Sequence, residues 1–124
     1  MLGTIAAAYG RMKKRNWNFP VDREVGYLQD HLEPKEQVLE LASGTLDGKP
    51  GLLALTERRL LFIAAGLSGR EQVFLAMPRG DFVRAEVRGT RLELRRRSAT
   101  ALQVSNVVPS DAKRLGDALA PASG

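Results

Sequence analysis

The chain contains no cysteine and a single histidine, His31, among its 124 residues. Without cysteine it can form no disulfide bond, no thiolate nucleophile and no thiolate metal site. One histidine leaves little scope for imidazole catalysis or for a histidine-rich metal centre. We therefore expect no catalytic residue, no metal and no cofactor, and we expect His31 to be a surface residue.

Aromatic residues are also scarce, at 6% of the chain, and long apolar runs are missing. The longest run, Leu60 to Leu67, is far shorter than the roughly 20 residues of a membrane-spanning helix. Hydrophobic residues at 44% and charged residues at 27% are typical of one globular domain of ordinary size. The sequence holds no metal-ligand cluster, phosphate-binding loop or paired-carboxylate pattern, so an enzyme of small substrates is the least favoured interpretation.

The positive charge is concentrated in two places. The formal net charge is +5, and residues 1–21 hold four basic residues and no acidic one. Residues 76–97 are also basic, whereas residues 22–75 carry more acidic than basic side chains. Nucleic-acid binding gains from aromatic side chains beside the basic ones, and the arginine-rich stretch has only Phe82. We expect no specific nucleic-acid partner.

Residues 1–21 form an amphipathic basic segment ahead of the remaining chain. Leu2, Ile5, Tyr9 and Met12 recur at helical spacing and predict a short helix. The residues that follow them are basic or aromatic: Lys13, Lys14, Arg15, Trp17 and Phe19. This apolar stripe can pack on the domain's own sheet, join copies of the protein, or lie in a membrane interface. A short helix needs a partner surface in water, and we expect the segment to join copies.

The order of charge and apolarity in this segment also bears on localisation. A secretory signal places its basic residues before the apolar stretch, and here they follow it. We therefore expect a cytoplasmic protein, with association to a membrane surface as the alternative.

Two more helices are predicted, one on each side of a run of strands. Asp22 can cap a helix over Arg23 to Leu32, with Val25 and Leu28 on its apolar face. Ser110 can cap the second, which runs from Pro109 to Ala120 with apolar residues at helical spacing: Ala112, Leu115 and Leu119.

Between these helices the apolar period changes from 3.6 to 2, which predicts β-strands. We expect seven of them, over Gln37–Ser43, Gly51–Thr56, Arg59–Ala65, Gln72–Met77, Phe82–Arg88, Arg91–Arg97 and Thr100–Asn106. Strands and helices do not alternate, so the sheet is expected to be antiparallel. The economical packing is a bent sandwich or partial barrel with the last helix over one open end.

One hairpin register can be read from the sequence. Gly89 and Thr90 suit a two-residue type II′ turn, because glycine at the first position accepts positive φ. This turn places Glu86 opposite Glu93 and Arg84 opposite Arg95. Each glutamate then has arginines on its diagonals, so the like-charge pairs are close to neutral in energy.

Two longer stretches carry a family resemblance. The stretch EQVLELASGTLDGKPGLLALTERRLLFIAAG resembles the first three strands of the bacterial pleckstrin-homology-like (PH-like) domains, and within them the YokE-like group. The later MPRGDFVRAEVRGTRLELRRRSATALQVSNV is similar to the remainder of that family. The resemblance covers about Glu33 to Ala120, is most specific from Leu55 to Phe62, and implies a seven-stranded bent antiparallel sandwich, mostly β, capped by a C-terminal helix. We assign residues 22–124 to this domain. We expect Thr56 to bond the turn after it, and Leu60–Ala65 to be buried on both faces.

The resemblance implies a scaffold for binding rather than a particular ligand. Relatives that bind phosphoinositides usually carry several basic residues in the first loop, whereas Gly44 to Gly51 holds Lys49 alone, so no specific phosphoinositide is expected. We expect a non-enzymatic module that binds a protein partner or its own copies, with weak binding to an anionic membrane surface as the alternative. The candidate residues outside the N-terminal segment are Arg84, Arg88, Arg91, Arg95, Arg96 and Arg97.

Overall fold

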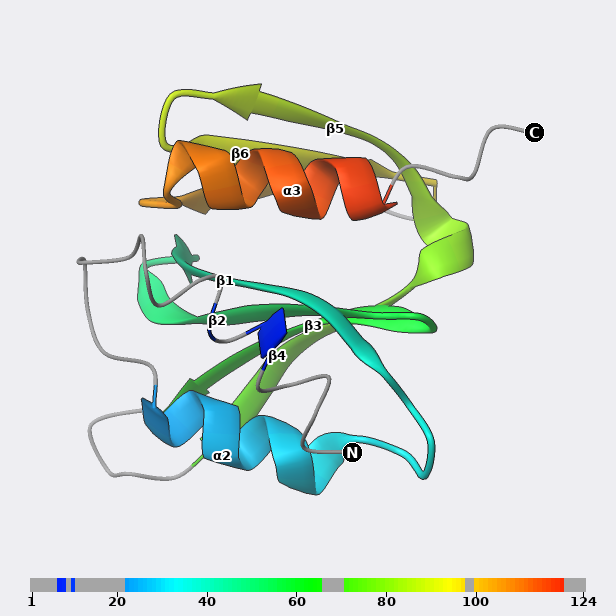
Figure 1. The fold of residues 1–124 in the computed structure, drawn as a ribbon. Helices are drawn as coiled ribbons and strands as arrows, with labels where there is room; N and C mark the ends of the chain where they lie inside the picture. The colour runs from blue at the N-terminus through cyan, green and yellow to red at the C-terminus, as the bar shows by residue number, and fades with distance from the viewer. Residues whose placement is uncertain (1–6, 9, 11–21, 66–70, 98–99, 120–124) are drawn as a thin grey trace.

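The structure is a computed structural model, and it describes residues 7–8, 10, 22–65, 71–97 and 100–119 (Figure 1). From residue 22 onward the elements are α2 (Asp22–His31), β1 (Val38–Leu46), β2 (Lys49–Thr56), β3 (Arg59–Ala65), β4 (Glu71–Pro78), the 3-10 turn η1 (Arg79–Asp81), β5 (Phe82–Arg88), β6 (Arg91–Arg96), β7 (Leu102–Ser105) and α3 (Pro109–Leu119). The helix–strands–helix order predicted from the sequence is confirmed.

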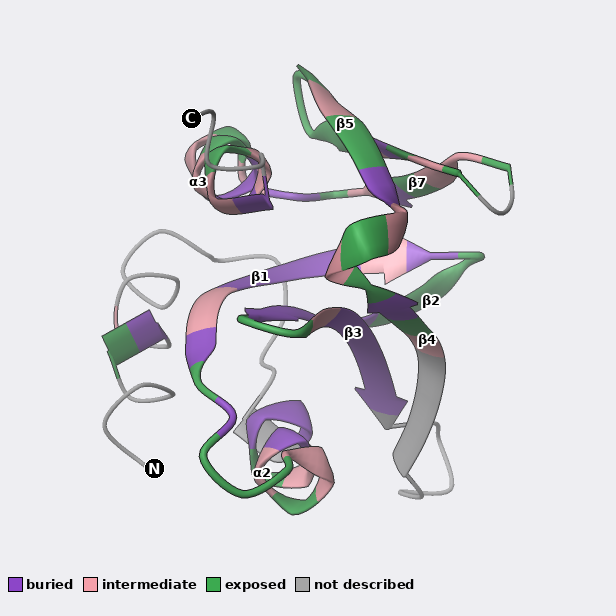
Figure 2. Ribbon diagram, turned by 90° about the vertical axis from the view of Figure 1, so that its right-hand side faces the viewer, coloured by how far each residue is buried: buried purple, intermediate pink, exposed green. Residues whose placement is uncertain are grey.

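The strands form one antiparallel sheet in the order β4-β3-β2-β1-β7-β6-β5. β1 pairs along its length with β2 but reaches β7 only through Thr45 and Leu46. The sheet therefore bends at the end of β1, with β1–β4 in one layer and β5–β7 in the other (Figure 2). β4 and β5 are the two edges and do not pair, so the sheet stays open. The expected fold class, a bent seven-stranded antiparallel sandwich with a C-terminal helix, is confirmed.

Two apolar cores lie on opposite faces of β1–β3. The inner core fills the space between the two layers and α3, and includes Leu53, Phe62 and Leu115. The outer core lies beneath α2 and includes Leu28 and Ile63 (Figure 2). Because adjacent residues of β3 alternate between the two cores, the strand is buried on both faces, as predicted.

Both helices bury the faces predicted for them, and α3 begins at Pro109, as predicted. Pro109 occupies its first position, and the backbone N–H of Ala112 donates to the carbonyl of Val108. Ser110 therefore lies inside the helix, and its predicted capping role is wrong. At the other end, Arg79 Nη2 donates to the carbonyl oxygen of Ala118 at 2.7 Å, which fixes the last turn of α3 to η1.

The first hairpin is longer and tighter than predicted. β1 continues to Leu46 and β2 starts at Lys49, so the expected loop from Gly44 to Gly51 is only a two-residue turn. Asp47 and Gly48 both have positive φ, at 51° and 77°, as a type I′ turn requires. Gly44 and Pro50 lie inside the strands, and Gly44 faces Gly51 within the ladder.

These two glycines are explained by close packing. A Cβ on Gly51 would lie 2.5 Å from the carbonyl oxygen of Ile63, and one on Gly44 would lie 2.6 Å from Cγ1 of Val104. Both positions therefore need glycine for space. This requirement comes from strands distant in the sequence, which is why local pattern misplaced the strand ends.

The β5–β6 hairpin agrees with its predicted register. Glu86 pairs with Glu93 and Arg84 with Arg95, and Gly89 has a φ of 59°. β6 ends at Arg96, one residue before the predicted end.

Candidate functional site

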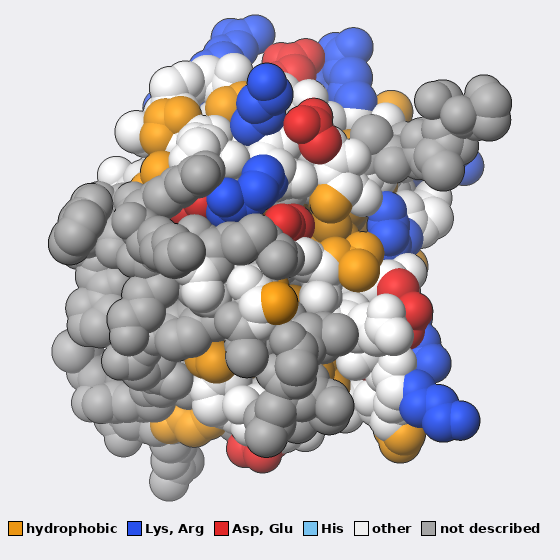
Figure 3. Space-filling view, in the orientation of Figure 1, with side chains coloured by type: hydrophobic (Ala, Val, Ile, Leu, Met, Phe, Trp, Pro, Cys, Tyr) orange, Lys and Arg blue, Asp and Glu red, His pale blue; other side chains and the backbone are white. Residues whose placement is uncertain are grey.

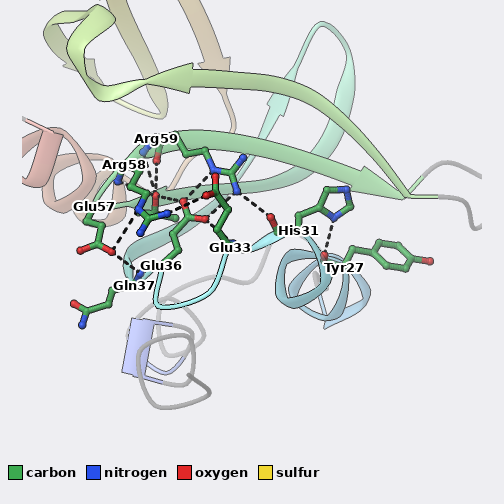
Figure 4. A network of polar contacts seen from close by, with 9 residues as sticks. Tyr27, His31, Glu33, Glu36, Gln37, Glu57, Arg58 and Arg59 are labelled. Atoms are coloured by element: carbon green, nitrogen blue, oxygen red, sulfur yellow. Dashed lines mark hydrogen bonds and ion pairs between the residues drawn. The ribbon is translucent and has the colours of Figure 1, made fainter.

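Glu36 is a buried carboxylate at the junction of α2, β1 and the β2–β3 turn (Figure 4). Arg59 donates two hydrogen bonds to it, from Nε to Oε2 at 3.0 Å and from Nη2 to Oε1 at 2.9 Å. The Thr56 hydroxyl donates to Oε2 at 2.6 Å, and the backbone N–H of Glu33 donates to Oε1 at 3.0 Å. Each carboxylate oxygen thus accepts two hydrogen bonds, which is its full capacity.

The remaining bonds of this cluster tie the same elements together. The Thr56 hydroxyl accepts from the backbone N–H groups of Arg58 and Arg59, both at 3.1 Å, which confirms the predicted turn role of Thr56. Arg59 Nη2 also donates to the carbonyl oxygen of His31 at the end of α2, at 2.9 Å. His31 itself is half-buried, with Nδ1 at 2.9 Å from the carbonyl oxygen of Tyr27.

The electrostatics of Glu36 follow from these contacts. Burial alone would raise its pKa, but the hydrogen bonds from Arg59, Thr56 and Glu33 and the positive charge of Arg59 lower the pKa from 4.5 to about 2. Glu36 raises the pKa of Arg59 in return, mainly through the same hydrogen bonds. The Glu36 carboxylate therefore stays deprotonated at neutral pH, and all of its acceptor positions are occupied by groups of the protein. The cluster is a structural joint, because it holds α2, β1 and the β2–β3 turn together.

The arginines predicted as a binding surface lie on the β5–β6 hairpin but do not form a free basic patch. Arg84 and Arg88 pair with Glu86 at 3.2 Å and 3.4 Å, and Arg95 pairs with Glu93 at 3.5 Å. A polar depression of about 270 Å³ on this face is lined by Glu86, Arg88, Arg91, Glu93, Arg95 and Gln103. The predicted register is confirmed, but these three ion pairs join residues two apart on the same strand and do not run along the predicted diagonals.

The last two candidate arginines are placed differently. Arg96 is half-buried, and its Nε donates to the carbonyl oxygen of Thr100 at 2.8 Å. The backbone N–H of Arg97 donates to the carbonyl of Asp81, and its side chain is exposed. The structure thus gathers four of the six candidates, on a face that they share with two acids.

An apolar groove lies between α3 and the edge strand β5, and the sequence did not predict it. Its volume is about 270 Å³, and it is lined by Phe82, Val83, Arg84, Ala85, Val87, Lys113, Gly116 and Asp117. Val83 is 48% exposed and Val87 40% exposed, and they are the large hydrophobic residues exposed in the described part of the chain. Apolar and charged side chains are interspersed on the upper part of the molecule as it is drawn in Figure 3.

The groove was missed because exposure depends on strand order. Ala85 and Val87 pair with the buried Leu94 and Leu92 and share their face, as predicted, whereas the register shifts between Phe82 and Arg84 and leaves Val83 without a cross-strand partner. However, β5 is the last strand of the sheet, and in the described part of the chain no strand pairs with its outer edge. The signal available in the sequence was the valine alternation itself.

The candidate residues of the N-terminal segment lie outside the described residues, so their predicted roles stay predictions. Within that segment the structure describes Ala7, Ala8 and Gly10. Ala8 is 1% exposed and belongs to the outer core with Val25 and Leu28 of α2. This one position therefore contacts the domain itself.

The described residues contain no group of three or more histidine, cysteine or acidic side chains able to hold a metal ion. Their helices are too short and too polar to span a bilayer.

The fold is that of a PH-like domain: a bent, open, seven-stranded antiparallel sheet with a C-terminal helix packed against β5 and β1. A sequence model of the family described as "Bacterial PH domain" matches residues 32–119, more than two thirds of the chain. The protein belongs to this bacterial PH domain family. The match does not distinguish the YokE-like group. Comparisons with curated proteins and with solved structures give no significant match.

Proposed function

We propose that the protein is a non-enzymatic binding module that takes up a segment of protein along the open edge of β5. The observation that carries the proposal is the pair of exposed valines, Val83 and Val87, on an edge strand beside an apolar groove. An edge strand presents unpaired backbone N–H and C=O groups, which another strand can bond. Apolar side chains at alternate positions of that strand would enter the groove.

Membership of a PH-like family supports a binding role in general, since these domains commonly serve as binding scaffolds. The full bonding of Glu36 also counts against the enzyme alternative, because this buried carboxylate is engaged in holding the fold. A protein partner suits the β5 groove better than a small polar substrate does, since most of its lining is apolar.

Selection of peptides from a random library tests the proposal. Protein immobilised at low density should enrich peptides with apolar residues at alternate positions. Val83→Lys combined with Val87→Lys should weaken their binding about tenfold or more, because charged lysines on an edge oppose strand addition. Thr90→Lys combined with Gln103→Lys is the matched control, since it adds the same charge at exposed positions off the edge. Equal binding to both double variants would contradict the proposal.

Weak binding to an anionic membrane is the second candidate, and exposed arginines on the hairpin favour it. The side chain of Arg88 is 82% exposed and that of Arg84 is 58% exposed. Glu86 lies between them and reduces the local charge, so we expect attraction that is nonspecific and lost in salt. Co-sedimentation with vesicles, with and without a phosphoinositide and across a salt series, measures it. A salt-resistant preference for one phosphoinositide would refute a nonspecific interaction.

A further inference from the structure

We infer that the segment taken up by β5 is β5 of a second copy, joined antiparallel about a two-fold axis at Ala85. This inference rests on the proposed function, because it assumes that the β5 edge is the binding surface. It adds the identity of the partner and the register. The strand reads Phe82-Val83-Arg84-Ala85-Glu86-Val87-Arg88.

Self-complementarity of the strand is the first argument. With Ala85 on the axis, Arg84 lies opposite Glu86 of the second copy, and Glu86 lies opposite its Arg84. Val87 of the second copy then faces the start of β5 at Val83, where the register with β6 shifts, so the exposed valines of the two protomers come together. Opposite charges and apolar side chains directly across an antiparallel pair are favourable.

Other registers of the same pairing are poorer. An axis at Arg84 or at Glu86 sets two like charges face to face. A shift by one residue pairs the polar face of one copy with the apolar face of the other. An axis at Val87 keeps the charge match with Arg88 but extends past the end of β5 into the turn. Only the axis at Ala85 combines the charge match with the full length of the strand.

The helix beside the groove repeats the pattern. Lys113 and Asp117 both line the groove and lie one helical turn apart. A two-fold axis reverses the direction of α3, so Lys113 of one copy is turned toward Asp117 of the other. Gly116 adds no bulk between them, and a Cβ there would already lie 3.4 Å from that of Ala85.

Arg84 and Glu86 also form an ion pair with each other within the protomer, and the dimer retains this ion pair. Glu86 bridges Arg84 at 3.2 Å along the strand. Across the axis each glutamate gains the arginine of the other copy, so four charges alternate in sign around the axis. The side chain of Arg84 is 58% exposed and that of Glu86 28% exposed, so both are accessible to a second copy.

Charge reversal tests the dimer, with mass measured by light scattering across a concentration series. The wild-type protein should approach twice 13.6 kDa. Arg84→Glu and Glu86→Arg should each weaken the dimer about tenfold or more, because each sets like charges face to face twice. The double variant R84E/E86R should restore the dimer. An equimolar mixture of the two single variants should also dimerise, because their charges match across the axis.

Arg88→Glu is the matched control. Arg88 lies on the same strand and face as Arg84 and bridges the same Glu86 within the protomer, at 3.4 Å. It faces no charge across an axis at Ala85, so its reversal should leave the dimer intact. Thermal melts of all variants verify folding.

The outcomes separate this inference from the proposed function. A wild-type protein that stays monomeric, or a dimer that the double variant does not restore, overturns the inference. If such a monomer still binds selected peptides and loses them in the Val83 and Val87 lysine variant, the proposed function survives without self-pairing. If neither dimer nor peptide binding responds to substitutions in β5, both fail.

Discussion

The Glu36 carboxylate makes bonds that the unfolded chain cannot reproduce. It accepts from Arg59, Thr56 and the backbone of Glu33, which belong to three separate parts of the fold. The difference between its pKa of about 2 in the folded protein and 4.5 as an ordinary glutamate is a contribution to stability. The sequence predicted the turn role of Thr56 but not this carboxylate, because its side-chain partners Thr56 and Arg59 are 20 and 23 residues away.

Glu36→Gln should lower the free energy of unfolding at pH 7 by about 3 kcal/mol, since each unit of pKa shift corresponds to about 1.4 kcal/mol. The folded pKa lies below the unfolded one, so the contribution is present above about pH 4.5 and is lost as the pH falls toward 2. Chemical denaturation from pH 7 to pH 2 measures this, and the acid-induced loss should be smaller in the variant.

The matched control is Glu33→Gln. Glu33 pairs with Arg58 at 3.0 Å, but its side chain is 58% exposed, so its removal should cost well under about 1 kcal/mol. Equal losses in the two variants would show that the buried joint has no special role.

At the scale of single elements, the ends of a strand are predictable where the local sequence pattern sets them. They are not predictable where packing against strands distant in the sequence sets them. β3 was placed correctly because an apolar run follows a turn signal, and both of its faces are buried. The ends of β1 and β2 were misplaced because Gly44 and Pro50 were interpreted as turn residues, whereas both lie inside strands. Gly44 and Gly51 are instead required by the space left by Val104 and Phe62, which come from other strands.

Phe62→Asp should abolish cooperative folding. The residue is fully buried in the inner core, on the central strand between β2 and β4. An unpaired charge there costs several kcal/mol, which is comparable to the whole stability of a small domain. Thr90→Asp, at an exposed position in the turn between β5 and β6, is the control and should melt close to the wild type. A melt of the Phe62 variant close to that of the wild type would contradict the assignment of β3 to the core.

At the scale of the whole molecule, the candidate site depends on which strand is last in the sheet. The sequence predicted the β5–β6 hairpin and its register. Whether β5 is an edge strand depends on the order of all seven strands, which the pairing of β1 with β7 sets. Because β5 is an edge strand, Arg84 and Glu86, which flank Ala85, can face a second copy of the protein. The hairpin register alone indicates only that the charge pairs between β5 and β6 are close to neutral in energy.

Residues 1–21 pose the remaining question for the whole molecule. The sequence favours a segment that joins copies. The burial of Ala8 in the outer core instead favours packing on the domain. The proposed dimer at β5 does not need the segment. We therefore expect deletion of residues 1–21 to leave the mass unchanged. It should lower the free energy of unfolding by about 1 kcal/mol or more, or a few degrees in Tm, because apolar surface under α2 becomes exposed.

Two neighbouring alanines allow the same test in the full chain. Ala8 is 1% exposed and Ala7 is exposed, so Ala8→Asp should lower Tm strongly while Ala7→Asp should not. Melting, mass and vesicle binding, measured together, separate the three roles. A loss of mass on deletion without a change in Tm would show that the segment joins copies, and a loss of vesicle binding alone would show that it serves a membrane. Equal melts of the two aspartate variants would refute the packing of this segment on the outer core.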